Sequence, residues 1–154
     1  MAVYFACLDS NNVVKNTVNV DDSAVAYDRD PAGEVYCQNL FGTGPNGNWV
    51  SYKQSSKAHP IAFRYNGAEK DGSYDPTNDA FIPVKPYELW ILNENYKWKA
   101  PINYPTHGRN GHEFEPGELG DGIEWSDSEA TWLNVLPGLP SLKWDVPTLD
   151  WVNL

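Results

Sequence analysis

The stretch IEWSDSEATWLNV, residues 123–135, indicates more about the fold than any other part of the chain. A second stretch, LKWDVPTLDWVNL at residues 142–154, aligns with it without a gap at an offset of 19 residues. Each has a tryptophan, six further residues, a second tryptophan, then an aliphatic residue, an asparagine and another aliphatic residue. This spacing predicts two small β-hairpins with cross-strand aromatic contacts, one holding Trp125 and Trp132 and the other Trp144 and Trp151.

A looser third copy of the pattern is YELWILNENYKWKAP at residues 87–101, where Trp90 and Trp98 flank a turn with one extra residue. An isolated hairpin is only marginally stable in water, so these units must pack either on the rest of the chain or on a neighbouring subunit. The connector VLPGLPSL, residues 135–142, is apolar but interrupted by proline and glycine. It suits an extended arm that lies in a groove.

Composition supports a mainly β protein. The 154 residues suffice for one core and include seven tryptophans and nine tyrosines but one methionine, so large rings must supply much of the buried surface. Tryptophan and tyrosine favour pleated, half-buried positions. We expect a small antiparallel sandwich or sheet of hairpins with an extended C-terminal arm and at most one or two short helices. Residues 1–106 would form the β domain, 107–122 an acidic glycine-rich loop, and 123–154 the tryptophan hairpins and arm.

The N-terminal half contains a predicted hairpin and a predicted helix. Alternating apolar residues at 3–7 and β-branched residues at 14–20 surround the turn sequence Asp-Ser-Asn-Asn, which predicts strand, turn and strand. The best helical candidate is residues 24–27, with an N-cap at one of residues 21–23 and an early end at Pro31 and Gly33.

Turns and short strands are expected farther along the chain. Residues 42–47, GTGPNG, predict a loop, and NWVSYKQ at 48–54 predicts a strand. The dipeptides Asn-Gly at 66–67 and Asp-Gly at 71–72 are typical of hairpin turns. Pro83 and Pro86 bracket a segment that fits an edge strand or an extended arm.

The charge of the chain argues against several partners. The net charge of −10 and the pI of about 4.5 oppose binding to nucleic acids and to anionic bilayers. No apolar run approaches the length of a membrane span, and the N-terminus lacks the pattern of a signal peptide, so we expect synthesis in the cytoplasm. Cys7 and Cys37 are expected to be free thiols, because their context does not indicate a secreted disulfide scaffold.

Two polar clusters contain side chains of the types that bind metal ions. His107, His112, Glu113 and Glu115 could bind zinc or manganese, but the glycine-rich spacing fixes no common face, which favours an ordinary polar loop. Asp71, Asp75, Asn78 and Asp79 carry oxygen ligands of the type calcium prefers, but they lack the spacing of an EF-hand loop, which favours turn chemistry. There is no Gly-x-Ser-x-Gly elbow and no phosphate-binding loop. We therefore expect neither an enzyme nor a cofactor or metal.

The central region resembles a specific protein family. Residues 1–20, roughly 65–106 and the last dozen residues are similar to small proteins encoded by tailed bacteriophages, especially marine cyanophages. The family pattern Y-D-x-x-x-D-A-F-I-P-x-x-P-Y-x-x-W-x-L-N-E-x-x-x-W-x-A-P-x-x-Y-P is carried here by Tyr74, Asp75, Asp79, Ala80, Phe81, Ile82, Pro83, Pro86, Tyr87, Trp90, Leu92, Asn93, Glu94, Trp98, Ala100, Pro101, Tyr104 and Pro105. The resemblance implies a component of the virion without known catalytic residues.

These observations predict a virion structural protein that is assembled in the host cytoplasm and binds other virion proteins, either the major capsid protein or tail proteins. Self-association is a further alternative. A capsid decoration or cement protein is the first expectation. A tail-fibre or baseplate accessory protein that contacts host glycans, or a tail-fibre assembly factor, are the alternatives. The binding residues are expected among aromatic and proline anchors. These are Pro86, Tyr87, Trp90, Trp98, Trp125, Trp132, Trp144 and Trp151.

Overall fold

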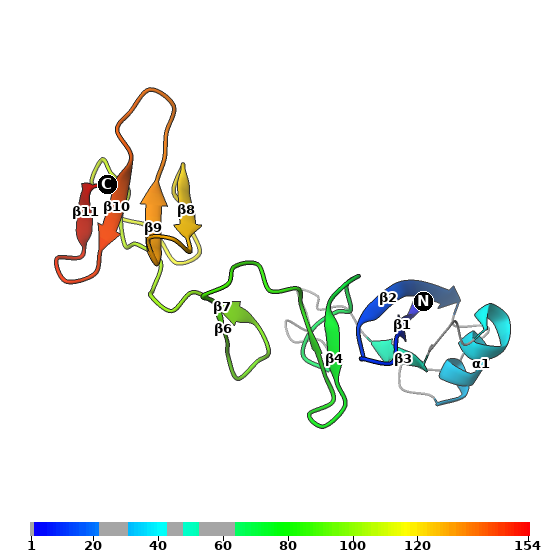
Figure 1. Cartoon of the computed structure of the whole chain (residues 1–154). Helices are drawn as coiled ribbons and strands as arrows, with labels where there is room; N and C mark the ends of the chain where they lie inside the picture. The colour runs from blue at the N-terminus through cyan, green and yellow to red at the C-terminus, as the bar shows by residue number, and fades with distance from the viewer. Residues whose placement is uncertain (1, 22–30, 43–47, 53–63) are drawn as a thin grey trace. The chain divides into compact units, whose positions relative to one another are not determined.

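The computed structural model describes residues 2–21, 31–42, 48–52 and 64–154 (Figure 1). These residues form two compact units. Unit 1 comprises residues 1–85 and 92–98, and unit 2 comprises residues 86–91 and 99–154. The division therefore falls between residues 86 and 99, ahead of the boundary predicted at residue 106, and the expected loop 107–122 belongs to unit 2.

Unit 1 is built on a three-stranded antiparallel sheet. Strands β1 (Ala2–Leu8) and β2 (Val14–Asp21) form the predicted hairpin, and β3 (Asn48–Tyr52) pairs with the other edge of β1. Successive side chains of a strand point to opposite faces of its sheet, so β1 buries one face with Val3 and Phe5 and the other with Ala6 and Leu8. Both faces of this sheet are therefore covered.

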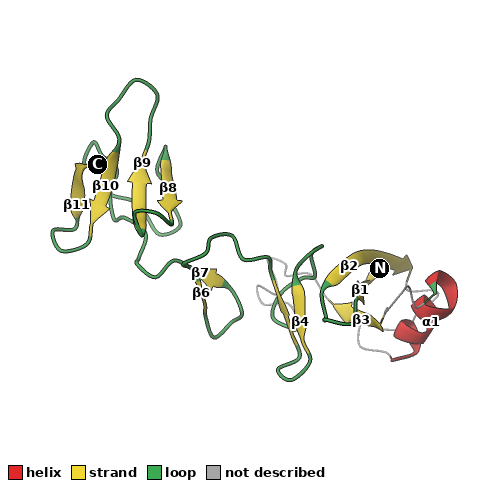
Figure 2. Cartoon of the chain, in the orientation of Figure 1, coloured by secondary structure: helices red, strands yellow, loops and turns green. Residues whose placement is uncertain are grey.

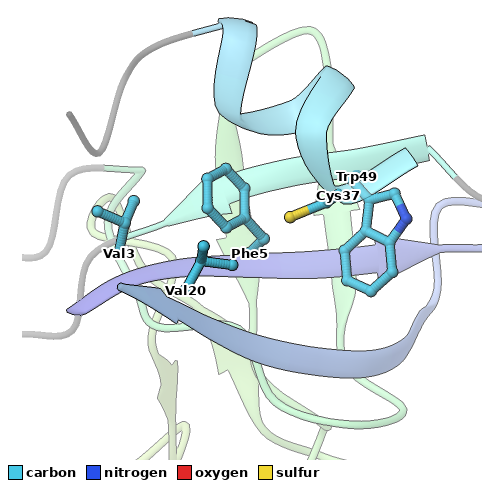
Figure 3. Packing of buried hydrophobic residues seen from close by; sticks show 5 residues of the cluster. All are labelled: Val3, Phe5, Val20, Cys37 and Trp49. Atoms are coloured by element: carbon cyan, nitrogen blue, oxygen red, sulfur yellow. The ribbon is translucent and has the colours of Figure 1, made fainter. Parts of the chain in front are cut away.

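The single described helix, α1 (Pro31–Phe41), covers the first face. Figure 3 shows Cys37 of the helix pointing toward Phe5 and Trp49 over the sheet. The sequence predicted that a helix ends at Pro31 and Gly33. This prediction is wrong, because both residues lie in the first turn of α1, which begins at Pro31. A proline is tolerated there since the first N–H groups of a helix have no partner within it. The predicted helix at 24–27 and the loop residues 43–47 lie outside the described residues.

A second hairpin covers the opposite face of the unit 1 sheet. It consists of β4 (Ser73–Asp75) and β5 (Ala80–Ile82), and its Phe81 packs with Ala6, Leu8 and Tyr52. The turn of this hairpin is residues 76–79, so the Asn-Gly and Asp-Gly dipeptides do not make the hairpin turn that they predicted. Asn66 is instead buried, where its amide donates to the backbone oxygens of Phe81 and Tyr96.

A short two-stranded ribbon, β6 (Ile91–Leu92) with β7 (Trp98–Lys99), lies where the chain passes from one unit to the other. Unit 2 then contains a four-stranded antiparallel sheet in the order β11-β10-β9-β8 (Figure 2). Its strands are β8 (Ile123–Ser126), β9 (Thr131–Asn134), β10 (Leu142–Asp145) and β11 (Asp150–Asn153).

The mainly β class built of antiparallel hairpins is confirmed. The C-terminal segment is not an extended arm, however, because β10 pairs with β9 as well as with β11. Among the described residues, no helix is both long and apolar enough to cross a membrane.

Candidate functional site: the tryptophan sheet and its cavity

The two predicted tryptophan hairpins are present with the expected pairing. Trp125 lies directly opposite Trp132, and Trp144 lies directly opposite Trp151. Their ring centroids are 5.4 Å and 5.3 Å apart, with interplanar angles of 79° and 70°. This edge-to-face arrangement places the positive edge of one indole against the negative face of the next, which stabilises each pair by about 0.5–1.5 kcal/mol beyond burial.

The same hairpin occurs a third time, in β4–β5 of unit 1. Tyr74 lies opposite Phe81, with ring centroids 4.9 Å apart. All three hairpins have a four-residue loop whose last residue has a positive φ, and these residues are Asp79 (51°), Ala130 (52°) and Leu149 (53°). Each loop is also capped by the last residue of its first strand, whose side chain accepts a backbone N–H from the loop; the capping residues are Asp75, Ser126 and Asp145. The sequence signal was an aromatic residue, six residues and a second aromatic residue at 74–81.

A short hairpin is present at the predicted third copy, because β6 pairs with β7, but Trp90 and Trp98 do not form a cross-strand pair in it. Its one extra residue gives a different turn, in which the N–H of Asn93 donates to the backbone oxygen of Lys97, and Trp90 lies outside the short strand β6. The two tryptophans also belong to different units. Trp98 donates its indole N–H to the backbone oxygen of Pro83 in unit 1.

Most of the predicted binding residues gather in one cluster on one face of the unit 2 sheet. Trp125, Trp132 and Trp144 are 5%, 9% and 4% exposed, and Tyr87, Trp90 and Trp151 are half-buried around them. Ala100, Ile102 and Tyr104 complete the cover over the indoles. Pro86 is exposed, and Trp98 is not part of the cluster. The cluster is therefore the core of unit 2, and a contact of these rings with a partner stays a prediction.

Polar groups fasten the covering segments to the sheet. Asp127, in the β8–β9 loop, accepts the indole N–H of Trp125 at 2.8 Å and the backbone N–H groups of Glu88 and Leu89 at 2.8 and 3.1 Å. At the other edge, the indole of Trp151 donates to the backbone oxygen of His107 at 2.9 Å. These bonds fix residues 86–91 and residue 107 against the sheet that they cover.

Two buried indole nitrogens are exceptions to this pattern. Nε1 of Trp90 and Nε1 of Trp132 have no hydrogen-bond partner among the described residues. A buried donor without a partner costs about 1–3 kcal/mol. Packing of the two rings offsets this cost, because each ring contacts several neighbours. The two rings also contact each other, with centroids 6.2 Å apart.

The loop expected at 107–122 forms a cavity with the end of β9 and the connector that follows it. The cavity has a volume of about 560 Å³. Its lining combines charged or polar side chains with apolar ones. The lining residues are Gly108, Arg109, Asn110, His112, Phe114, Glu118, Leu119, Gly120, Asp121, Asn134, Leu136 and Leu139. No sequence motif had indicated this site, because its walls come from two segments separated by β8.

Both histidines of this loop pair with carboxylates. Nε2 of His112 lies 3.0 Å from Oε1 of Glu118, and Nε2 of His107 lies 3.2 Å from Oδ1 of Asp150. The pKa of Glu118 is lowered chiefly by the backbone N–H of Glu115 and then by His112, and the pKa of Asp150 is lowered by the backbone N–H of Trp151 and then by His107. Both carboxylates are therefore anionic at neutral pH.

In both polar clusters with metal-binding residue types, side chains have partners within the protein. The histidines form the pairs above, and Asp75 accepts the backbone N–H groups of Thr77 and Asn78 within its own turn. Within the described ranges, no group of three histidine, cysteine or acidic side chains is placed to hold a metal ion. Cys7 and Cys37 are free thiols.

Several large apolar side chains of unit 2 stay exposed once the tryptophans are buried. Leu119 is 78% exposed, and the others lie in residues 86–91, in the connector, in the β10–β11 loop and at residue 154. They are Leu89, Ile91, Val135, Leu139, Val146, Leu149 and Leu154. Comparison with known proteins finds no matching family model, no matching curated protein and no matching solved structure.

Proposed function

We propose that this chain is a non-enzymatic structural protein of a bacteriophage particle and that it binds other particle proteins through unit 2. The head surface is the first place we propose for it, as a decoration or cement protein. The resemblance of residues 65–106 to phage virion proteins supports the particle, and the exposed apolar side chains of unit 2 support the binding surface. Exposed apolar side chains on a folded domain mark interaction surfaces when they gather in patches.

The observation that carries this proposal is the contrast between the buried indoles and the exposed leucines of unit 2. Trp132 and Trp144 lie within the core, whereas Leu139 and Leu149 extend from loops between paired strands. A rigid sheet presents such side chains at fixed positions, which reduces the entropy lost on binding. Leucines inserted into pockets of a partner would then contribute binding energy by burial.

The acidic side chains of unit 2 support a structural role in place of a catalytic one. Asp127, Asp145 and Glu118 each accept backbone N–H groups, and side chains that do so stabilise loops. The high negative charge of the chain would keep free copies apart by repulsion before they bind to a particle.

The proposal is tested by measuring the copy number of the protein in purified particles separated into heads and tails. A decoration protein is expected at high copy on heads, and its removal should lower the resistance of the capsid to heat. A few copies found with the tails would contradict the head assignment and favour the accessory role. Absence from mature particles would contradict both and favour an assembly factor.

Variants then test the surface itself. Leu139→Ser combined with Leu149→Ser should abolish binding to particles that lack the protein, while the unfolding temperature is retained. Val84→Ser is the matched control, because Val84 is an exposed aliphatic residue of unit 1. Equal binding by the double variant and the control would refute a surface in unit 2.

A tail-fibre or baseplate accessory protein that contacts host glycans is the second candidate. The cavity beside β9 favours it, because concave sites lined by both polar and apolar groups are typical of small-ligand binding.

A further inference from the structure

The cavity of unit 2 contains an arginine, Arg109, that has no acidic partner in the part of the chain that the structure describes. Nη1 of Arg109 donates to Oδ1 of Asn134 at 3.2 Å and to the backbone oxygen of Pro140 at 3.1 Å. No carboxylate of the described residues lies within 4.0 Å of this guanidinium. In a chain with a net charge of −10, an arginine that pairs with uncharged oxygens is unusual, and its remaining N–H donors are available to a ligand.

A buried amide holds this arginine in place. Asn134 is 1% exposed, and its Nδ2 donates to the backbone oxygen of Asp121 at 2.9 Å while its Oδ1 accepts from Arg109. The side chain of Asn134 therefore connects β9 with both ends of the loop formed by residues 107–122. The guanidinium is held before any ligand arrives, which reduces the entropy that binding would otherwise cost.

Another part of the lining is apolar, and its packing depends on a glycine. A Cβ atom at Gly120 would lie 2.4 Å from Cζ of Phe114, so the aromatic ring packs directly on the backbone at this position. Leu136 and Leu139 add aliphatic surface from the connector. The cavity thus has a flat aromatic wall and a cationic group among its lining residues.

The remaining polar groups of the lining are partly occupied. Glu118 accepts from the backbone N–H of Glu115 and pairs with His112, and Oδ1 of Asn110 accepts the backbone N–H of His112. The amide nitrogen of Asn110 is left as a donor. Asp121 contributes its backbone oxygen to Asn134, as described above.

We propose that this cavity binds an acidic sugar of the uronic acid class. Its carboxylate would bind the fork of Arg109, and the C–H face of its ring would pack on Phe114. Its hydroxyl groups would bond Asn110 and Glu118. The volume of about 560 Å³ falls in the range of about 300–1,000 Å³ that is usual for small-ligand sites. A phosphate dianion fits less well, because its second negative charge would be repelled by the acidic side chains of Glu118 and Asp121, which also line the cavity. The cavity would bind such a sugar whether the protein belongs to the head or to the tail of a particle.

The test is a titration of the full chain with glucuronate, glucose and acetate, followed by NMR chemical shifts and calorimetry. Glucuronate should bind at least tenfold more tightly than either of the others, and the shifts should concentrate at residues 108–121. No binding at millimolar concentration would overturn the proposal, and so would equal binding of glucose or of acetate. Tighter binding of N-acetyl-leucine would also overturn it and would identify a site for apolar carboxylates.

Two variants separate recognition from folding. Arg109→Gln should weaken glucuronate binding at least tenfold, whereas Lys143→Gln, outside the cavity lining, should leave it unchanged. Unchanged glucuronate binding by Arg109→Gln would refute the proposal. If Arg109→Gln lowers the unfolding temperature, Phe114→Leu decides, because it keeps apolar volume and removes the flat ring. Loss of glucuronate binding in a folded Phe114→Leu protein supports the site, and full retention overturns it.

Discussion

The two units of the chain build their hydrophobic cores from different sets of side chains. Unit 1 packs aliphatic side chains such as Val3 and Val14 together with rings such as Phe5 between a sheet, a helix and a hairpin, so that both faces of β1 are covered. Unit 2 covers one face of a four-stranded sheet with irregular segments, and its core consists largely of indole and phenol rings. The difference teaches that a few large rings can replace a layer of regular structure, provided that polar bonds position the covering segments.

The first way to break this comparison is to remove one ring. Trp132→Ala should destabilise unit 2 by about 3–5 kcal/mol, because it removes contacts with Trp90, Tyr104 and Trp125 at the centre of the cluster. Urea unfolding followed by near-UV circular dichroism measures the effect. Trp98→Ala, outside the cluster, is the matched control and should cost much less. Equal losses would show that the cluster is not the core of unit 2.

A second change tests the tight packing of the chain on itself next to the sheet. Gly122 has a φ of +67°, and a Cβ there would lie 2.5 Å from the backbone oxygen of Val135. Gly122→Ala should therefore lower the free energy of unfolding by at least about 2 kcal/mol. Gly138 has a φ of +77° but open space around it, so Gly138→Ala isolates the backbone strain and should cost about 1 kcal/mol. The comparison uses thermal unfolding, and a smaller loss at Gly122 would contradict the close approach.

The polar bonds that fasten the cover of unit 2 give a third test. Asp127→Ala should cost about 1–3 kcal/mol, because it leaves the N–H groups of Glu88, Leu89 and the Trp125 indole without this acceptor. Hydrogen exchange should accelerate at Glu88 and Leu89. Glu129→Ala, which removes an exposed carboxylate 3.8 Å from Lys143, is the control with an expected effect below about 1 kcal/mol. Unchanged exchange at both amides would refute the fastening role.

The type of hairpin that occurs in both units also offers a substitution that should increase stability. Ala130 has a φ of 52°, which strains a residue with a side chain, so Ala130→Gly should stabilise unit 2 by about 0.5 kcal/mol after the entropic cost of glycine. Glu129→Gly, one position earlier in the same loop, should instead destabilise by about 0.5–1 kcal/mol. Opposite signs in chemical unfolding would confirm the loop conformation, and a loss in both variants would contradict it.

The smallest expected effect is a change in the stability of the fold at acidic pH. Asp150 has a pKa lowered by the Trp151 N–H and then by His107, so its contribution to stability is complete above the ordinary aspartate pKa and is lost as the pH falls through the lowered value. Asp150→Asn should thus reduce the loss of stability between pH 5 and pH 2, which are approximate limits around the reference value near 4. Thermal unfolding across this range measures it. Glu124→Gln, at an exposed position of β8, is the control, and an equal change in both variants would contradict the assignment.

The hairpins were predictable because their signals are local. The aromatic residues seven positions apart at Trp125 and Trp132, and again at Trp144 and Trp151, correspond to directly opposed positions around a four-residue loop. The same rule would have found Tyr74 and Phe81, where smaller rings concealed the repeat. It also explains why the hairpin β6–β7 lacks a pair between Trp90 and Trp98, because one more residue changes the turn.

The sequence by itself determined the β class, the N-terminal hairpin and the cross-strand tryptophan pairs, because these depend on residues close in the chain and on the alternation of side chains along a strand. The tertiary structure alone decided which face was covered, that β10 joins β9 in place of an extended arm, and that Arg109 meets Asn134 across a cavity. Those contacts join residues far apart in the chain. They depend on how the elements pack in space, which no local pattern encodes.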